Sequence, residues 1–299
     1  MLHSGYNCEG YYDGYNLDQN ELKQYKSEVV DPRKEGQLTS NNKTRYEFVL
    51  TPNFGFLASP EPLLKDTELK LSFDRAKWSN AITKVEDPTT PLTGESGLTI
   101  LDCYAQVEYV SSPAYRAYFD KINTSPIIYE YEECDVIIKS IPQNVTELRF
   151  DNLRGGNVPS YIFAGIIPQA NLNGSDFVSC TRFEANAVRE IDITLNGSSV
   201  NGYPIQINNN CPVYPLHQFL DVTGRLYDNT CGSAINLQTF KYNWIWAYKS
   251  EAEKTSRGWT GISFTLAQEY STPMCLVVWI INDAALSIDK FHMIEKINL

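Results

Sequence analysis

The stretch that decides the fold of this chain runs from Asp151 to Val200 and reads DNLRGGNVPSYIFAGIIPQANLNGSDFVSCTRFEANAVREIDITLNGSSV. Within this stretch, Ser160–Ile167 is a continuous apolar run, too short for a globular helix and rich in Ile, Tyr and Phe. Pro168 follows directly, and its missing amide proton ends a strand ladder. We therefore expect a strand at Ser160–Ile167 that is buried on both faces.

The second half of the same stretch predicts a turn, a half-buried strand and a hairpin. Asn173-Gly174 tolerates positive φ and indicates a turn. From Val188 to Leu195, apolar residues interleave with polar ones, and the alternation is strict from Ile191 on, which predicts one buried and one wet face. Asn196-Gly197 is then the strongest short-range signal for a tight hairpin.

Strand signals of similar length occur on both sides of this stretch. Before it we expect strands at Tyr46–Thr51, Phe54–Ala58, Thr67–Phe73, Leu98–Val110, Ile127–Tyr131 and Asp135–Ile141, with a further strand at Thr146–Phe150. After it we expect strands at Tyr242–Tyr248, Thr260–Leu266 and Met274–Asn282, then an edge-like segment from Ala285. Many short strands separated by turn signals are typical of an all-β sandwich or jelly roll.

Two helices are predicted as inserts between these strands. Ser112 can cap a helix that Pro113 opens and that runs to Ile122, because Ser is a good N-cap and Pro suits the first helical position. The second is expected at Cys211–Val222, with Gly224 just past its end as a C-terminal cap.

Composition and charge exclude several classes of function. The 299 residues carry a formal net charge of -11, which argues against a dedicated nucleic-acid surface, because phosphate binding requires a basic footprint. No apolar run approaches the roughly 20 residues that span a bilayer. The N-terminus lacks the basic start and apolar core of a secretory signal peptide. We expect no membrane span and no sequence-specific binding of nucleic acid.

The residue types that carry chemistry do not form a recognisable site. The seven cysteines include no C-x-x-C pair and are interpreted as free thiols in a reducing compartment. His3, His217 and His292 fall on separate elements without the spacing of metal ligands. The cluster Glu130, Glu132, Glu133 and Asp135 could serve acid–base catalysis or calcium binding, but a charge run on a strand is more often a solvated face. We assign no catalytic, metal or cofactor residue and expect no enzyme.

Trp244 and Trp246 support a competing hypothesis. Two residues apart, they share one face of a predicted strand and could line a sugar-binding platform, since jelly rolls include lectins. Core packing or a subunit interface is the interpretation that we favour for this pair. A jelly-roll enzyme of the cupin type is a further alternative, but the metal histidines of cupins have no counterpart here.

The order of motifs in the C-terminal half resembles a known family. The segment from Ser140 to Ser175, a Phe pair at Phe177 and Phe183, and REIDITLNGSSV are similar to the second jelly roll of the double jelly-roll major capsid proteins of Polinton (Maverick) elements and adintoviruses. The residues that carry this resemblance are Asp151-Asn152-Leu153, Pro159 with Gly165, Asn173-Gly174-Ser175 and Leu195-Asn196-Gly197, with the closing segment Leu286–Asp289. The match is good from about Leu98 onward and looser over Arg45–Phe73.

This resemblance implies a structural protein of a viral or virus-derived icosahedral capsid, located in the virion and made in the host cytoplasm or nucleus. It implies a homotrimeric capsomer whose partners are the protein itself, neighbouring capsomers and penton or minor capsid proteins. It also implies three regions: an irregular arm at 1–44, a partial first jelly roll at 45–141 and a second jelly roll at 142–299. We expect the interface to use aromatic residues of the arm and of the two helical inserts: Tyr6, Tyr11, Tyr12, Tyr15, Tyr115, Tyr118, Phe119, Tyr214 and Phe219.

The chain departs from this family at its N-terminal side. A double jelly roll has about sixteen strands, and only about six strand candidates precede Pro142. The chain would then be a truncated or domesticated copy, a fragment of a longer reading frame, or a smaller relative that completes its sheet with the arm or a neighbour. We favour the first or the third, because half a sandwich would expose apolar edges.

Overall fold

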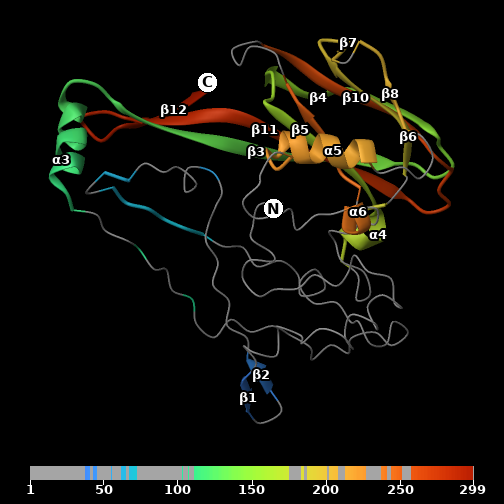
Figure 1. The fold of residues 1–299 in the computed structure, drawn as a ribbon, viewed down its shortest axis with the longest axis horizontal. Helices are drawn as coiled ribbons and strands as arrows, with labels where there is room; N and C mark the ends of the chain where they lie inside the picture. The colour runs from blue at the N-terminus through green and yellow to red at the C-terminus, as the bar shows by residue number, and fades with distance from the viewer. Residues whose placement is uncertain are drawn as a thin grey trace.

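A computed structural model describes residues 111–174, 183–184, 187–200, 202–207, 213–226, 237–240, 244–250 and 257–298, together with short pieces at 38–40, 43–45, 55, 62–64, 67–72, 103 and 107. Over these residues the chain is mostly antiparallel β-sheet with few helices, which confirms the predicted all-β class. Figure 1 shows a two-sheet body from which a long β extension leads away.

The first sheet is organised around one long central strand. β11 (Met274–Ile288) pairs along its whole length with β3 (Ile127–Ile141). Because β3 occupies one edge of β11, the other edge is shared: β5 (Tyr161–Pro168) pairs with its first half and β12 (Ile294–Asn298) with its last five residues. β9 (Trp246–Lys249) continues the sheet beyond β5.

The second sheet has β10 (Arg257–Leu266) between β4 (Glu147–Asn157) and β6 (Val188–Leu195). Two short strands, β7 (Ser198–Ser199) and β8 (Ile205–Gln206), pair with successive parts of β6 and together act as one broken edge strand. All pairings in this sheet are antiparallel.

The strand order of the two sheets is that of a jelly roll. When the strands are counted from β3, with β7 and β8 taken as the fifth, the first sheet has the order 1-8-3-6 and the second has the order 2-7-4-5. Eight strands distributed in this way form two Greek keys wound into a sandwich. The described residues from β3 to β11 therefore contain one jelly roll with all eight strand positions filled.

The core lies between the two sheets. On the second sheet, Ile262 and Phe264 of β10 are buried, and the Phe264 ring lies 6.3 Å from that of Phe150 in β4. On the first sheet, Val278 and Ile280 of β11 are fully buried and belong to the same core. Burial of each such side chain contributes roughly 1.5–3 kcal/mol, which makes this core the main source of stability.

A third layer covers part of the outer face of the first sheet. Helix α5 (Val213–Val222) packs there through Phe219, whose ring lies 6.1 Å from that of Phe163 in β5. Phe183 covers the neighbouring position, Gly165, and makes an edge contact with Trp279 at 5.4 Å. The short helices α4 (Gln169–Leu172) and α6 (Leu237–Phe240) lie at the same end of the body (Figure 1).

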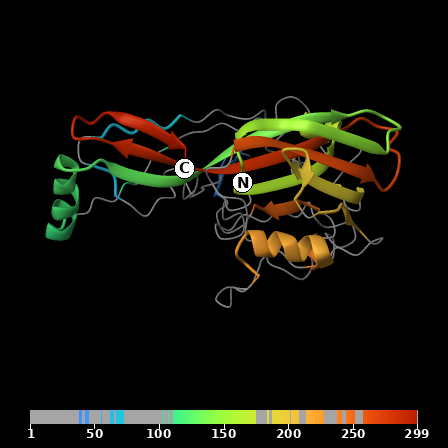
Figure 2. The ribbon, with the colours of Figure 1, turned by 90° about the horizontal axis from the view of Figure 1, so that it is seen from above.

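β3 and β11 continue beyond the sandwich and form an extension with β12, which we call the arm. Pairing of β11 with β5 ends at Ile281, and pairing with β12 begins at Ala284. Helix α3 (Pro113–Asp120) and the 3-10 turn η4 (Lys121–Asn123) lie at the far end of the arm (Figure 2). The arm has a small cluster of its own, in which Leu64, Ile127, Tyr129 and Ile288 are buried.

Several local predictions are confirmed. β5 is buried along its length and ends at Pro168, and Asn196-Gly197 forms the two-residue turn between β6 and β7 with positive φ at both residues. Ser112 caps α3, since its Oγ accepts a hydrogen bond from the Ala114 N–H at 3.2 Å. Gly224 ends α5 at φ +70, with the Arg225 N–H donating back to the Leu220 carbonyl at 2.8 Å.

Other predictions are corrected. Ile127–Tyr131 and Asp135–Ile141 are one strand, β3, and this strand belongs to the sandwich although the sequence pattern placed it in the preceding region. Thr67–Phe73 was expected as a strand, but its described residues 67–72 are not in one, because their alternating apolar side chains have no ladder partner among the described residues and Leu69 and Leu71 are exposed. At the end of the N-terminal region that was expected to be irregular, β1 (Leu38–Ser40) and β2 (Lys43–Arg45) pair with each other.

Candidate interaction surface

The side chains of β3 separate into two rows because successive residues of a strand point to opposite faces. The odd-numbered residues face inward, beginning and ending with the buried Ile127 and Ile141. The even-numbered residues from Ile128 to Ser140 are all exposed, and we call this set the outer row. β3 therefore presents one inward and one exposed row of side chains along its whole length, with buried residues at its two ends.

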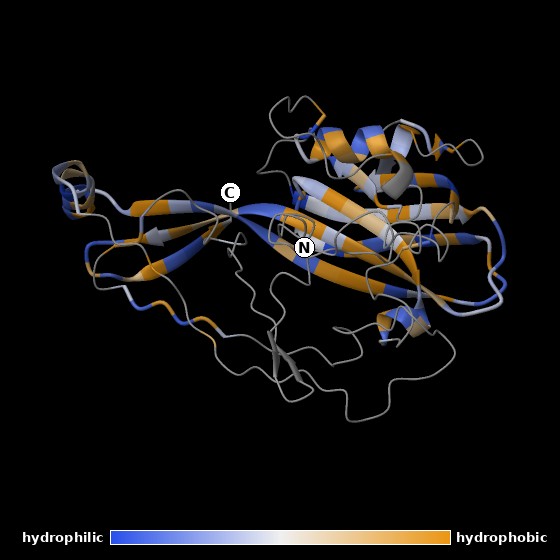
Figure 3. Ribbon diagram, turned by 60° about the horizontal axis from the view of Figure 1, so that its bottom comes forward, coloured by the Kyte–Doolittle hydropathy of each residue, from blue (hydrophilic) through white to orange (hydrophobic). Residues whose placement is uncertain are grey.

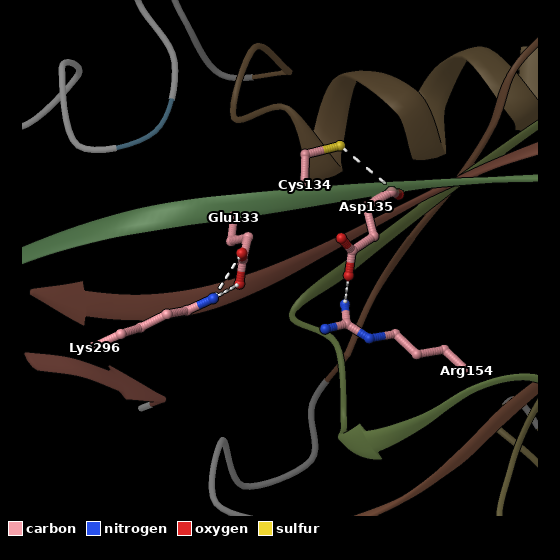
Figure 4. A network of polar contacts seen from close by, with 5 residues as sticks. All are labelled: Glu133, Cys134, Asp135, Arg154 and Lys296. Carbon is pink, nitrogen blue, oxygen red and sulfur yellow. Dashed lines mark hydrogen bonds and ion pairs between the residues drawn. The ribbon is translucent and has the colours of Figure 1, made fainter. Parts of the chain in front are cut away.

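Two ion pairs lie on the inward side of β3 where the arm leaves the sandwich. Lys296 of β12 donates to both carboxylate oxygens of Glu133 at 2.7 Å, and Arg154 of β4 pairs with Asp135 at 2.5 Å (Figure 4). The hydrogen bond to Glu133 is the main reason why the pKa of Lys296 is raised above its ordinary value. These pairs tie the arm and the second sheet to the same segment of β3.

This arrangement corrects the interpretation of the acidic cluster as one solvated face. Glu130 and Glu132 are exposed in the outer row, whereas Glu133 and Asp135 point inward and are neutralised by cations. Strand alternation separates neighbours in the sequence, so these carboxylates do not converge on one site. Among the described residues, no three His, Cys, Asp or Glu side chains are grouped closely enough to hold a metal ion.

The outer row combines apolar and acidic side chains on an edge strand. Val136 is 54% exposed and Ile138 is 51% exposed, and Ile128 is exposed further along. Cys134 lies between Glu132 and Val136 in the same row, and the pKa of its thiol is raised, chiefly by partial burial and further by the nearby Asp135 and Glu132 carboxylates. Neighbouring exposed apolar residues of this kind often indicate a contact surface.

The expected interface residues of the first helical insert lie at the far end of the arm. Tyr115 of α3 is exposed, and Phe119 is partly buried against the arm's cluster. The side chain of Tyr118 lies outside the described residues, as do Tyr6, Tyr11, Tyr12 and Tyr15. Tyr115 is therefore the residue of this group that the structure places at an accessible surface.

The second helical insert divides its two expected residues between surface and core. Tyr214 is exposed at the start of α5. Phe219 is fully buried between the rings of Phe163 and Phe240, at 6.1 and 5.7 Å. It is a packing residue that fixes α5 on the sheet, because the apolar side of the helix faces β5 and β9.

The tryptophan pair of the lectin-like hypothesis is inside the molecule. Trp244 and Trp246 are buried, and their rings meet edge to face at 6.2 Å. A sugar platform needs an accessible ring face, which this pair does not provide. Trp259 of β10 is 47% exposed, but it stands at the other sheet.

A second exposed apolar group, not found by the sequence reasoning, lies at the β11–β12 turn. Phe291 is 72% exposed and Met293 is 68% exposed, with Ile294 exposed beside them. Three large apolar residues in the short segment after Asp289 were the available signal, but the segment resembles an ordinary edge strand. Among the described residues, no helix is both long and apolar enough to cross a membrane.

Comparisons with known proteins found matches among solved structures alone. No protein-family model and no curated protein matches the chain. The mavirus major capsid protein matches with 9% identity and a TM-score of 0.35, covering 58% of this chain and 42% of that protein. A chain of the Sputnik virophage matches with 11% identity and a TM-score of 0.34, covering 58% of this chain and 39% of that one.

A chain from the PBCV-1 virus capsid matches with 10% identity and a TM-score of 0.37, covering 63% of this chain and 55% of that one. The chain thus spans about two fifths to just over half of the length of the structures that it matches. These neighbours are viral capsid proteins and virus particles. The strand order of the two sheets, rather than these likenesses, identifies the jelly roll in this chain.

Proposed function

We propose that this chain is a structural protein that assembles with copies of itself into a viral or virus-derived capsid shell. One observation carries the proposal: the chain contains a jelly roll whose first sheet continues as an arm, and both the edge strand β3 and the tip of the arm expose large apolar side chains. Exposed apolar groups at two separate places are costly for a monomer and are covered when copies associate.

The other established uses of jelly rolls have less support. Jelly rolls also serve as lectins and cupins. The candidate sugar platform is buried in the core at Trp244 and Trp246, and the described residues contain no group of metal-binding side chains of the kind on which cupins depend. A role in assembly requires accessible contact surfaces instead, and the outer row of β3 provides one.

The finer assignment follows from the sequence motifs. We propose a lineage close to the Polinton (Maverick) and adintovirus major capsid proteins, a homotrimeric capsomer and a place in the virion, with penton or minor capsid proteins as further partners. We also propose that the jelly-roll unit begins at β3, since this strand pairs with β11 over all fifteen residues, and that residues before it form a separate region.

Size-exclusion chromatography with light scattering, followed by negative-stain electron microscopy, tests the proposed function. The purified chain is measured over a wide range of concentrations, and we expect a mass above that of one chain that increases with concentration, with capsomers or shells on the grid. The mass of one chain is 33.9 kDa. A strictly monomeric protein at the highest concentration, with no particles, would exclude self-assembly as its function.

A further inference from the structure

The turn between β11 and β12, which we call the tip, has a fixed backbone and exposed apolar side chains. The Asp289 carboxylate accepts hydrogen bonds from the N–H groups of Phe291 and Met293, both at 2.9 Å. The Asp289 N–H donates to the Met293 carbonyl at 3.1 Å. The turn is therefore held in shape while its apolar side chains point into solvent, which is the arrangement of a preformed contact surface.

The tip also carries an accessible cation in an acidic protein. Lys290 is exposed and lies 5.0 Å from the centre of the Phe291 ring, and His292 is exposed next to it. The whole chain has a net charge of -11. The tip thus offers apolar side chains and one exposed lysine, in a chain whose net charge is negative.

The outer row of β3 has the complementary composition. Val136 and Ile138 supply exposed apolar surface, and Glu132 and Glu130 supply negative charge two and three positions from Val136 in the same row. Neither of these two carboxylates forms an ion pair with any residue that the structure describes. Both the apolar and the charged parts of the row are therefore available to a partner.

The tip and the Val136–Ile138 part of the outer row cannot meet within one chain. The tip follows the pair Ile288–Ile127 at the far end of the arm, and Val136 is nine residues further along β3. At about 3.3 Å per residue in a straight strand, the two surfaces are about 30 Å apart. Contact between them requires two copies of the chain, and because the surfaces differ, the contact is head to tail and can be repeated around a ring.

We infer that the tip of one copy docks onto the outer row of β3 in a second copy, with Phe291 and Met293 covering Val136 and Ile138, and Lys290 facing Glu132. This inference rests on the proposed self-assembly and names the surfaces that carry it. Burying these side chains removes apolar area from water at both ends of the contact. Charge favours this direction of docking, because two outer rows facing each other would bring the carboxylates of Glu130 and Glu132 together.

Cross-linking tests the contact directly, because Cys134 stands in the middle of the outer row. Met293→Cys places a second thiol at the tip, and mild oxidation at weakly alkaline pH should join copies into dimers and longer ladders on a non-reducing gel, since a disulfide forms between residues whose Cβ atoms approach to about 4 Å. Met293→Cys with Cys134→Ser is the matched control. Ladders of equal intensity in that control, or no ladders in either variant, would overturn the inference.

A charge exchange tests the direction of docking without relying on thiols. Lys290→Glu and Glu132→Lys should each weaken association about tenfold at low salt, and the two together in one chain should restore most of it, because each copy then presents the reversed pair. Association is measured by sedimentation velocity over a concentration series. Equal or additive weakening in the double variant would show that these two residues do not face each other.

The outcomes separate this inference from the function on which it rests. If the unaltered protein stays monomeric, the proposed assembly itself is wrong. If it assembles, but cross-linking does not depend on Cys134 and the exchanged charges do not restore association, assembly stands and uses other surfaces. Thr265→Lys on the wet face of β10 serves as the control for added charge and should leave association unchanged.

Discussion

The sandwich and the arm are built from the same two strands but are stabilised to different degrees. Within the sandwich, β11 has a neighbouring strand on each edge and packed side chains on both faces, from the second sheet on one side and from α5 and Phe183 on the other. In the arm, its continuation has β3 and the short β12 as neighbours and a cluster of four buried residues. Strand pairing alone extends the sheet, but layers on both faces are what stabilise it.

The boundary between the two regions is polar. Glu133 and Asp135 interrupt the apolar inward row of β3, and Asn282 of β11, paired with Glu133, has a buried amide without a hydrogen-bond partner among the described residues. Figure 3 shows hydrophilic colour where the strands leave the body. The arm is therefore joined to the sandwich by backbone pairing and ion pairs rather than by a shared core, and we expect it to open locally before the sandwich unfolds.

Trp246→Ala should have the largest effect, because it removes an aromatic anchor from the better-packed region. The Trp246 ring is buried against Trp244, and deleting a buried aromatic side chain costs about 3–5 kcal/mol of unfolding free energy. Urea unfolding measures this loss. Hydrogen exchange should show reduced protection in the arm as well, because β3 and β11 lose their register when the sandwich opens.

Trp259→Ala is the matched control for this change. Trp259 is a tryptophan of the second sheet with half of its side chain already in water, so its removal should lower the unfolding free energy by about 1 kcal/mol or less. Equal losses in the two variants would mean that Trp246 is not a core residue.

Gly165→Ala should have the next largest effect, because it tests the third layer. An added Cβ would lie 2.5 Å from the Phe183 ring, which is itself buried against Trp279 and has little room to move. Overpacking of this kind costs about 1–3 kcal/mol of unfolding free energy. Adding Phe183→Leu to this variant should recover part of the lost unfolding free energy. Gly155→Ala is the control: no atom lies within 4 Å of its new Cβ, so the unfolding free energy should change little.

Tyr129→Phe should have a smaller effect that is confined to the arm. The Tyr129 hydroxyl donates a hydrogen bond to the Pro62 carbonyl at 3.2 Å, within the small buried cluster of the arm. Losing that bond costs about 0.5–1.5 kcal/mol. Hydrogen exchange should be faster in β12 and the distal half of β3, with protection in β5 unchanged; faster exchange throughout β5 would show that arm and sandwich open together.

The features that could be predicted from the sequence are local ones. The turn at Asn196-Gly197, the end of β5 at Pro168 and the cap at Ser112 depend on residues that determine their own backbone, so their positions were correct. The fold class followed from the number of short strands. These predictions needed no information about which strands lie beside each other.

The pairing of distant strands could not be predicted in the same way. That β3 belongs with β11, more than a hundred residues later, depends on packing between both strands and the second sheet, and β3 was therefore placed in the wrong region. Phe219 was expected at an interface because the helix pattern marks its apolar side but not what covers it. The outer row was missed because alternation in β3 mixes apolar and acidic residues on one face, and the tip was missed because its segment resembles an ordinary edge strand.

Lys296→Gln should have the smallest effect and tests the junction between the two regions. The pKa of Lys296 is raised in the folded protein, mainly by its hydrogen bonds to Glu133, so the pair stabilises the fold fully below the ordinary lysine pKa of about 10.4 and ceases to do so as the pH rises through the higher folded value. Because both side chains are partly exposed, the variant should lose about 0.2–1 kcal/mol at neutral pH.

The pH dependence distinguishes this ion pair from a loss of packing. The difference in unfolding free energy between the unaltered protein and Lys296→Gln should be constant from neutral pH to about pH 10, and then decrease toward zero as Lys296 loses its proton. High salt should reduce the same difference, since about 1 M salt screens charges beyond roughly 3 Å. Lys249→Gln, which removes a lysine that makes no ion pair with the described residues, should show neither dependence. A difference that persists at high pH and high salt would mean that the aliphatic part of Lys296, and not its charge, joins the arm to the sandwich.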